Sequence, residues 1–381
     1  MKKILIIHNK YRTEGGEDIA VSNEIELLKK YFNVRVLIYD NKIKSISDIL
    51  SFIFLSNYSI NKEIMDTVGK FKPDVVYFNN TWFKVSLGIF KKLIASKCKI
   101  LIKLHNFRYD CTKSLLSSRH LAGAKLCPAC GFSKNKFHPF NKYFKDSYIK
   151  SLFVIYFNKK YIKFLKNNKI SIVVLTEFHK NFLLRKHGIK DNVYIIPNYI
   201  KSIMSPKNNS NYFIYAGRIS NEKGVAELIE AFLNSKFKTH RLQILGTGPA
   251  LIELQKRFSQ ENILFLGQIP NTETINLISN SLGVLSATKL YEGQPTLLCE
   301  ALLNEIPCIF PNSGGITEFL PASYPLTFQQ YDYDDLLAKI NFLYHNSEND
   351  NYLSDGKKFI QKKLDKISIS NKFIEIMQDD T

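Results

Sequence analysis

Short runs of β-branched and other apolar residues alternate with longer amphipathic stretches along the 381-residue chain. Strands that are apolar along their whole length are covered on both faces, as in a parallel sheet between two layers of helices. The alternation therefore predicts an α/β fold. The strands expected in the first half are Lys3–His8, Val34–Tyr39, Asp74–Asn79, Ile100–His105, Ile172–Thr176 and Tyr194–Pro197.

A polar segment over 201–211 interrupts this pattern and predicts a linker. A second series follows, with strands expected over Tyr212–Ala216, Leu242–Leu245, Ile263–Leu266, Gly283–Ser286 and Pro307–Phe310 and helices over Val225–Phe232 and Ala250–Phe258. We expect two Rossmann-like, doubly wound domains over 1–200 and 201–350, facing across a cleft, with ligands at the carboxyl ends of the strands. The periodic stretch 351–381 predicts terminal helices, and packing back on the first domain is one arrangement for them.

The charge is unevenly divided. Residues 1–200 carry 36 Lys and Arg against 14 Asp and Glu, whereas 201–381 carry 17 and 20. This asymmetry predicts a polyanionic partner for the first half, such as nucleic acid, anionic lipid or a phosphorylated acceptor. A well-solvated lysine surface without a partner is the alternative.

Composition also indicates a compartment. Six cysteines in 381 residues are typical of a reducing cytosol. No apolar run approaches the roughly 18 residues that span a bilayer, and the apolar stretch Ile4–Ile7 is too short for a signal peptide. We therefore expect a cytoplasmic protein.

A first motif, Gly217–Gly224, lies between an expected strand and an expected helix. Its two cations, Arg218 and Lys223, beside the N–H groups of a helix N-terminus would form a cradle for a diphosphate. The alternative is that Arg218 pairs with a carboxylate and Lys223 is solvated.

A second motif, Gly246-Thr-Gly248, follows the next strand, and its glycines let the backbone approach a ligand closely. The third glycine of the dinucleotide fingerprint is replaced by Leu251, which argues against NAD at this turn.

A third motif places Glu292 and Glu300 around the start of a helix expected over Thr296–Leu303. The first N–H groups of that helix would point at whatever Glu292 faces. A carboxylate such as Glu300 can accept two hydrogen bonds from a ribose diol. Alternatively, Glu292 only favours the helix start and Glu300 is a surface residue. A fourth motif is the glycine-rich turn Pro311–Glu318.

In this order and spacing, the four motifs resemble the second domain of the retaining glycosyltransferases of family 4, also called glycosyl transferases group 1, which have the GT-B fold. The resemblance implies a retaining transferase that uses a UDP- or GDP-sugar and needs no catalytic metal. It implies that Arg218 and Lys223 hold the diphosphate, while Glu300 binds the ribose. The donor-binding residues implied are Gly15, Gly16, Arg218, Lys223, Gly246, Gly248, Gly293, Gln294, Pro295, Thr296 and Glu300. Pro295 lacks the N–H that many members offer to the sugar.

The first half adds two pieces to the resemblance. The loop Arg12–Glu17 resembles the family's glycine-rich loop, with a plain turn before a helix over Asp18–Tyr31 as the alternative. His105 ends an expected strand, where family members place a histidine beside the reacting sugar, although a lone histidine is more often structural. The catalytic residues implied are therefore His105 and Glu292, and the acceptor-binding residues are Glu17 and Asn106.

An insertion expected over about 107–140 contains Cys111, Cys127 and Cys130. The Cys-Pro-Ala-Cys-Gly sequence has the shape of a structural zinc knuckle, for which His138 or His120 would be the fourth ligand. Reduced thiols that pack a loop are the alternative.

The segment 141–169 mixes aromatic and aliphatic residues with eight lysines. This composition is typical of a helix on an anionic membrane surface, and the alternative is a crossover helix packed on the sheet with its lysines in water. The full hypothesis is a glycosyltransferase at the inner face of the plasma membrane. Its acceptor would be a lipid-linked (polyprenyl diphosphate) glycan of lipopolysaccharide O-antigen or capsule. The alternatives are a nucleotide-sugar epimerase of the GT-B fold and a basic nucleic-acid-binding protein.

Overall fold

The structure is a computed structural model, which describes residues 1–11, 15–42, 46–82, 84–96, 98–110, 126–129, 147–201, 210–345 and 351–378. The described residues divide into two compact units. Unit 1 contains the stretch up to Asp110, residues 147–199 and the last residues from Leu364 onward. Unit 2 contains Leu126–Ala129 and the stretch from Ile200 to Lys363.

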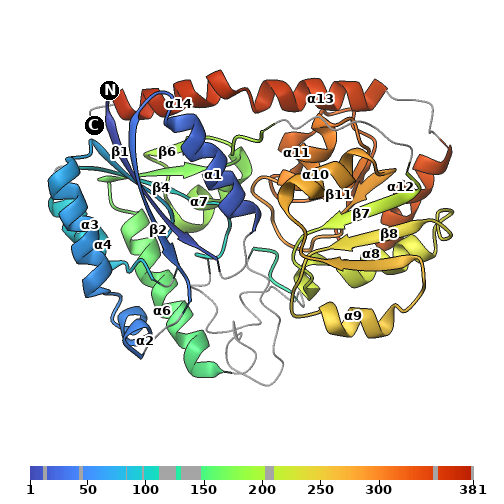
Figure 1. Cartoon of the computed structure of the whole chain (residues 1–381), viewed down its shortest axis with the longest axis horizontal. Coiled ribbons are helices and arrows are strands. Elements are labelled where there is room, and N and C mark those ends of the chain that lie inside the picture. Colours follow the sequence, from blue (N-terminus) through green and yellow to red (C-terminus); the bar gives the residue numbers. More distant parts are fainter. Residues whose placement is uncertain are drawn as a thin grey trace. The chain divides into compact units, whose positions relative to one another are not determined.

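Unit 1 is built on a six-stranded parallel sheet in the order β2-β1-β3-β4-β5-β6 (Figure 1). The strands are β1 (Lys3–Lys10), β2 (Asn33–Asp40), β3 (Val75–Asn80), β4 (Lys99–Lys103), β5 (Ile170–Val174) and β6 (Val193–Ile195). The helices are α1 (Gly16–Leu28), α2 (Ile46–Ile53), α3 (Tyr58–Phe71), α4 (Gly88–Ala95), α6 (Tyr148–Leu165), α7 (Glu177–His187) and α14 (Lys366–Gln378).

The central strand β1 shows why both faces of this sheet need helices. Its residues Ile4 to Ile7 are completely buried, and successive side chains point to opposite faces. Ile4 and Ile6 join a core with α1 and α14, whereas Leu5 and Ile7 join a second core with α3, α4, α6 and α7. The uninterrupted apolar run thus corresponds to a strand between two helical layers.

Unit 2 has a six-stranded parallel sheet in the order β12-β11-β10-β7-β8-β9. The strands are β7 (Tyr212–Ala216), β8 (Arg241–Leu245), β9 (Ile263–Gly267), β10 (Gly283–Leu285), β11 (Cys308–Asn312) and β12 (Thr327–Gln329). The helices are α8 (Val225–Leu233), α9 (Leu251–Arg257), α10 (Asn271–Ser279), α11 (Thr296–Leu303), α12 (Tyr333–His345) and α13 (Asn351–Lys363), with 3-10 turns η1 (Asn221–Lys223) and η2 (Ile316–Phe319).

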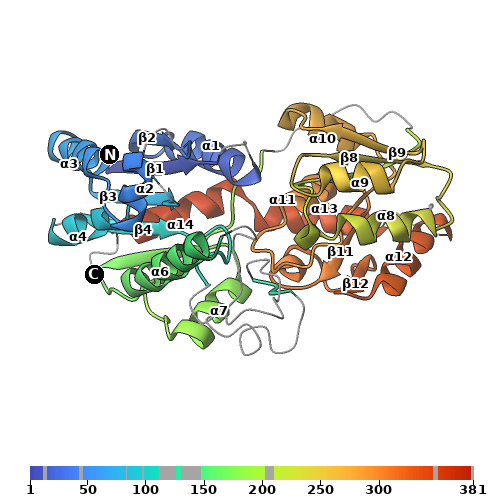
Figure 2. The same cartoon turned by 90° about the horizontal axis from the view of Figure 1, so that it is seen from below.

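The predicted fold class is confirmed: each unit is a parallel sheet with helices on its faces (Figures 1 and 2). Several details differ from the expectation, among them the end of β4 and the strand β12. Strand β4 ends at Lys103, so His105 lies in the loop after the strand. Strand β12 was not predicted because it has three residues, of which only Phe328 is buried.

The last helix, α14, supplies a large part of the unit 1 core. Phe373 is fully buried, and its ring lies edge-on to Tyr77 of β3 with centroids 5.8 Å apart. On the same helix Ile367 is 59% exposed. The chain's single tryptophan, Trp82, is in unit 1.

These contacts predict that Phe373→Ala lowers the free energy of unfolding of unit 1 by about 3–5 kcal/mol, since it removes a buried ring and leaves a cavity. Urea unfolding followed by the fluorescence of Trp82 measures this loss. The control, Ile367→Ala, removes an exposed side chain and should change the free energy by less than about 0.5 kcal/mol. Equal effects of the two substitutions would contradict the packing described.

Candidate active site

In unit 2 the strand order reverses between β7 and β10, which are neighbours although other strands separate them in the sequence. In open α/β sheets, ligands bind at the carboxyl ends of the strands at such a switch point. The loop that follows β7 carries Arg218 and Lys223, and the loop that follows β10 carries Glu292. The topology thus brings the first and third sequence motifs to one edge of one sheet.

Lys223 and Glu292 form an ion pair at this edge, with 2.5 Å between Nζ and Oε1. Thr288 donates a hydrogen bond of 3.0 Å from Oγ1 to the same carboxylate oxygen. Both members of the pair remain partly accessible, at 27% and 23% of the side-chain surface. The alternative of a merely solvated Lys223 is therefore wrong for this structure.

Arg218 differs from Lys223 in its surroundings. It is exposed, and the structure describes only its backbone oxygen in a hydrogen bond, which it accepts from Tyr215 at 2.9 Å. Among the described residues its guanidinium is thus available to an anion, and the expectation that it pairs with a carboxylate receives no support from the side chains placed around it.

Glycines allow the loops of this edge to touch. Gly246 has φ of 127°, and a Cβ added there would lie 1.9 Å from the carbonyl oxygen of Gly217. Gly224 has φ of 67°, and its Cβ would lie 2.0 Å from the carbonyl oxygen of Ala287. No side chain fits at such distances. In this structure these glycines bring backbone to backbone, which agrees with the weaker interpretation that Gly246 and Gly248 form a tight turn between a strand and a helix.

The loop of Glu292 is held from two further sides. The N–H of Gly315 in the fourth motif donates to the carbonyl oxygen of Glu292 at 2.8 Å. The N–H of Tyr291 donates to the carbonyl oxygen of Pro128 at 2.5 Å. The fourth motif therefore positions the third, a role that its sequence does not reveal.

Helix α11 begins directly after this loop. Gly293, Gln294 and Pro295 are buried, and Thr296 is the first helical residue, as predicted. The first N–H groups of a helix have no acceptor within it and carry partial positive charge. The N-terminus of α11 thus adds to the cationic character near Lys223.

Glu300 lies on α11 and is half-buried. Burial raises the pKa of its carboxyl group to about 7, although a hydrogen bond with Asn271 acts in the opposite direction. Burial penalises the charged form because the carboxylate loses water. Near neutral pH both the protonated carboxyl group, which can donate a hydrogen bond, and the carboxylate, which only accepts, are populated. The alternative of an ordinary surface residue is wrong for Glu300.

In unit 1 the reversal of strand order lies between β1 and β3. His8, near the end of β1, is buried and contacts Asp18 of α1, with 2.8 Å between Nε2 and Oδ1. The other oxygen of Asp18 accepts the N–H of Gly15 at 2.9 Å. Asp18 therefore fixes the loop that leads into α1, of which Gly16 is the first residue. Residues 12–14 of this loop lie outside the described part of the chain.

His105 has its Nε2 at 2.9 Å from Oδ1 of Asn79, which lies in β3. Burial, with Lys103 and His8 as further causes, holds the pKa of His105 well below its usual range. The imidazole is therefore neutral. A carbonyl oxygen only accepts, so Nε2 carries the hydrogen, and the buried Nδ1 has no hydrogen-bond partner among the described residues.

Glu17 and Asn106 are brought together, since Nδ2 of Asn106 donates to Oε2 of Glu17 at 3.2 Å. The hydroxyl of Tyr11 donates to the same oxygen at 2.9 Å. Burial raises the pKa of Glu17, and nearby Arg108 opposes that rise. The two predicted acceptor residues thus form one polar cluster, to which Tyr11 and Arg108 also belong.

The zinc prediction falls mostly on residues outside the described part. These are Cys111, Cys130, His138 and His120. Cys127 is described and is buried within unit 2. Over the residues that the structure places, no three His, Cys, Asp or Glu side chains are grouped to hold a metal ion. The zinc site stays a prediction.

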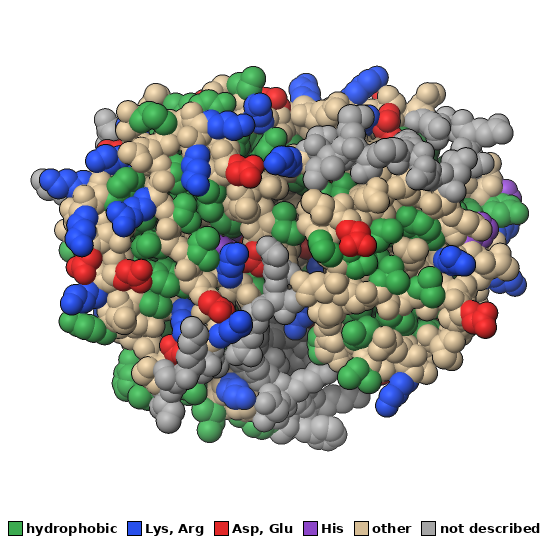
Figure 3. Space-filling model, in the orientation of Figure 1, with side chains coloured by type: hydrophobic (Ala, Val, Ile, Leu, Met, Phe, Trp, Pro, Cys, Tyr) green, Lys and Arg blue, Asp and Glu red, His purple; other side chains and the backbone are tan. Residues whose placement is uncertain are grey.

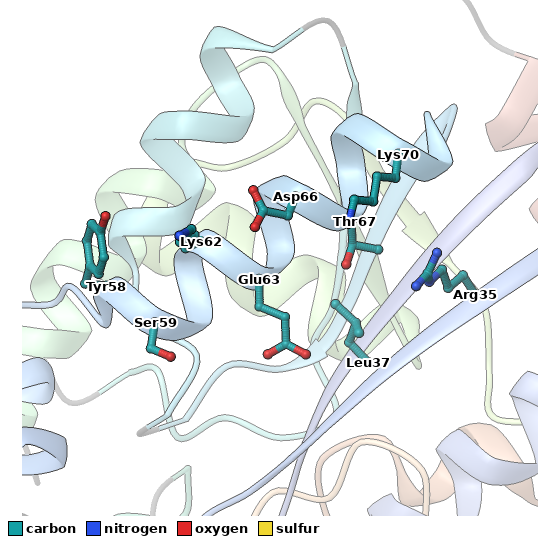
Figure 4. Close-up of a pocket in the computed structure, with 9 residues that line it drawn as sticks. All are labelled: Arg35, Leu37, Tyr58, Ser59, Lys62, Glu63, Asp66, Thr67 and Lys70. Atoms are coloured by element: carbon teal, nitrogen blue, oxygen red, sulfur yellow. The ribbon is translucent and has the colours of Figure 1, made fainter.

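A separate hollow of about 520 Å³ lies on the outer edge of unit 1, between β2 and α3 (Figure 4). Its lining mixes Arg35, Lys62 and Lys70 with Glu63 and Asp66, so basic and acidic side chains offset one another. Strand β2 is an edge strand, far in strand order from β4, whose following loop carries His105. The sequence did not single out this hollow, and its charges favour no class of ligand.

Four contact residues were missed by sequence reasoning, namely Asp18, Asn79, Asn271 and Thr288. Asn79 had a usable signal, because it ends an expected strand beside the strand of His105. Thr288 lies shortly after the strand expected over Gly283–Ser286 and could have been found in the same way. Asn271, at the start of α10, and Asp18 carry no signal of their own.

Residues 200–358 match the family model described as Glycosyl transferases group 1. The chain is 28% identical to the amylovoran biosynthesis glycosyltransferase AmsD of Erwinia amylovora, over 36% of this chain and 42% of that protein. It is 26% identical to the capsular polysaccharide biosynthesis glycosyltransferase CapM of Staphylococcus aureus, over 41% of this chain and 43% of that protein. The chain thus aligns with less than half the length of these curated relatives.

Solved structures resemble the chain over nearly its whole length. The sucrose-phosphate synthase of Thermosynechococcus elongatus has a TM-score of 0.73 at 14% identity, covering 99% of this chain and 98% of that one. Anabaena Alr3699/HepE in complex with UDP and glucose has a TM-score of 0.69 at 14% identity, covering 99% of each chain. The expected GT-B fold is confirmed by these likenesses, and the group 1 match supports the resemblance of the second half. None of the helices that the structure describes combines the length and the apolar composition of a membrane-spanning segment.

The backbone contact at Gly224 predicts that an added methyl group lowers the free energy of unfolding of unit 2. Gly224→Ala should destabilise unit 2 through the left-handed φ, at about 1–2 kcal/mol, and through the clash with Ala287, at about 1–3 kcal/mol more. Gly267→Ala is the matched control, because Gly267 has φ of 72° with nothing within 4 Å of an added Cβ. Calorimetric unfolding should show a larger loss for Gly224→Ala. A loss no larger than that of the control would show that the loops do not touch.

The raised pKa of Glu300 predicts a dependence of stability on pH. The folded state holds the proton up to about pH 7, whereas the unfolded chain releases it near the ordinary value of 4.5. As the pH rises through this window, the wild type loses stability relative to Glu300→Gln, and the difference stays constant above it. Thermal unfolding of both proteins from pH 4.5 to pH 8 measures the difference. A difference that does not change with pH would mean an ordinary pKa.

Proposed function

We propose that this chain is a glycosyltransferase that moves a sugar from a nucleoside diphosphate to a glycan acceptor. The observation that carries the proposal is the meeting of Lys223, Glu292 and the N-terminus of α11 at the switch point of the unit 2 sheet. Cations and free N–H groups suit a diphosphate. A carboxylate beside them suits the hydroxyl groups of a sugar.

In this proposal Arg218 and Lys223 bind the diphosphate. When the bond between sugar and phosphate breaks, negative charge develops on the leaving diphosphate, and fixed cations stabilise it most where water is excluded. Lys223 would exchange its contact with Glu292 for one with the phosphate, which frees Glu292 to bind the sugar. Because two side chains supply the positive charge, the proposal requires no metal ion.

Further donor contacts come from the same edge of unit 2. Glu300, with its pKa near 7, would accept hydrogen bonds from the ribose diol when ionised. The backbone N–H groups of Gly293, Gln294 and Thr296 would bind sugar hydroxyls, whereas Pro295 has no N–H to offer. We propose UDP as the nucleotide, supported by the UDP bound in the Alr3699/HepE structure.

Unit 1 would supply His105, Glu17 and Asn106. We propose that a hydroxyl of the transferred sugar donates to the buried Nδ1 of His105, which has no hydrogen-bond partner in the described structure. The loop at Gly15 and Gly16 would approach the donor phosphates, while Glu17 and Asn106 bind the acceptor. The resemblance to family 4 supports transfer with retention of configuration, in which the acceptor attacks from the face of the departing phosphate.

The acceptor is proposed to be a lipid-linked glycan of a bacterial surface polysaccharide. The names of the relatives, which refer to amylovoran and to capsular polysaccharide, support this class. The basic first half also suits an anionic, membrane-held acceptor. The enzyme would then work at the inner face of the plasma membrane.

Four substitutions test the assignment of roles. Arg218→Ala and Glu300→Ala should weaken the binding of UDP about 10- to 100-fold, the loss expected for hydrogen bonds to charged groups. His105→Ala and Glu292→Ala should lower turnover more than UDP affinity. Titration calorimetry with UDP and mass spectrometry of reactions with a panel of UDP-sugars and a lipid-linked acceptor provide the two measurements.

The matched control is Arg241→Ala, because Arg241 is an exposed arginine at the opposite, amino-terminal end of a strand in the same sheet. It should leave UDP affinity and turnover unchanged. If Arg218→Ala also leaves UDP affinity unchanged, the proposed diphosphate site is wrong.

A further inference from the structure

Helices α2 and α6 of unit 1 expose large apolar side chains. Phe54, directly after α2, is 73% exposed, and Ile149 in the first turn of α6 is 69% exposed. The other exposed apolar residues of the two helices are Ile49, Leu50, Leu152 and Tyr156. Side chains of this size normally lie in a core or an interface.

Aromatic contacts join these two helices, so their exposed residues lie on neighbouring elements of unit 1. The ring of Phe52 in α2 stacks on Phe157 in α6 at a centroid distance of 5.3 Å. The ring of Trp82 lies 5.8 Å from Phe52 and 5.1 Å from Phe157. Figure 1 shows both helices at the lower end of unit 1.

Helix α6 has two distinct faces. Val154, Phe157, Tyr161 and Leu165 are buried, and most of them pack in the core against the sheet. On the outer face, spacings of three and four residues align Leu152 and Tyr156 with Lys159 and Lys163. A packed crossover helix and a surface-binding helix are alternatives for this segment in the sequence, but the two faces of α6 allow both.

The charge of this surface is entirely positive along α6. Lys150, Lys159, Lys160 and Lys163 are exposed, and the described sequence from Tyr148 to Thr176 contains no Asp or Glu. The acidic residue of α2, Asp48, is largely buried and pairs with Lys84 at 3.2 Å.

We propose that this α2–α6 surface binds the face of an anionic lipid bilayer. We define it as the exposed apolar residues Ile49, Leu50, Phe54, Ile149, Leu152 and Tyr156 with Lys150, Lys159, Lys160 and Lys163. Apolar side chains enter the boundary between head groups and acyl chains, while lysines bind the anionic head groups.

Charge complementarity favours an anionic bilayer over a second copy of the chain as the partner of this surface. A second copy that docked through the same surface would bring lysine rows together, and α6 offers no carboxylate to pair with them. Figure 3 shows hydrophobic and basic side chains on the lower left part of this face, together with some acidic ones. The inference rests on the proposed function in one respect, because a membrane-held acceptor explains why such a surface would be useful.

Vesicle co-sedimentation of the full chain tests the inference. The probes are vesicles of phosphatidylcholine alone and vesicles that also contain phosphatidylglycerol. We expect binding to the anionic vesicles that weakens with salt. The triple variants Phe54→Ser/Leu152→Ser/Tyr156→Ser and Lys159→Glu/Lys160→Glu/Lys163→Glu should each bind them about tenfold or more weakly. All substituted side chains are exposed, so circular dichroism should show an unchanged fold.

The matched control is Ile252→Ser/Lys256→Glu, which changes an exposed apolar residue and an exposed lysine on α9 of unit 2. It should bind the anionic vesicles as the wild type does. Wild-type binding by both triple variants, or equal binding to both kinds of vesicle, would overturn the proposal. So would a dimer in sedimentation equilibrium that dissociates in the triple variants, since the occupant would then be a second copy.

Titration with UDP separates this inference from the proposed function. If the triple variants lose vesicle binding while every protein binds UDP equally, the α2–α6 surface and the nucleotide site are both supported. If vesicle binding behaves as expected but no protein binds UDP, the surface stands and the proposed function fails.

Discussion

The arrangement at the carboxyl edge of the unit 2 sheet depends on backbone contacts that only glycine permits. The loop after β8 reaches the loop after β7 at Gly246, and the loop after β7 reaches the loop after β10 at Gly224. A methyl group at either position would meet a carbonyl oxygen at about half of normal contact distance. Because the loops touch, Lys223 and Glu292 form their ion pair although they are 69 residues apart. The ion pair at this edge therefore depends on the lack of a side chain at Gly224 and Gly246.

The two units have parallel sheets with different strand orders. Each sheet is parallel and reverses its strand order once, between β1 and β3 in unit 1 and between β7 and β10 in unit 2. In unit 1 the polar residues near this reversal are tied to one another, as in the contacts of His8 with Asp18 and of Asn79 with His105. In unit 2 the ion pair of Lys223 with Glu292 is partly accessible, and Arg218 is exposed. The contacts in unit 1 hold side chains in place, whereas the polar side chains in unit 2 remain accessible to solvent.

Features with a strong local signal could be predicted from the sequence. The buried strands and the start of α11 at Thr296 follow from apolar runs and from the turn before the helix. Features set by tertiary contact could not. The low pKa of His105 and the raised pKa of Glu300 depend on burial by distant segments. Likewise, the sequence of a glycine motif is the same whether its backbone contacts a ligand or another loop. Strand β12, with three residues, is too short to show an alternating pattern.

Hydrogen exchange with and without UDP is the decisive measurement for the proposal that the loops after β7 and β10 form the nucleotide site. We expect slower exchange of backbone amides over 217–224 and 288–300 when UDP is added, with little change in the hollow between β2 and α3. Protection confined to that hollow, or an absence of protection in both loops at saturating UDP, would contradict it.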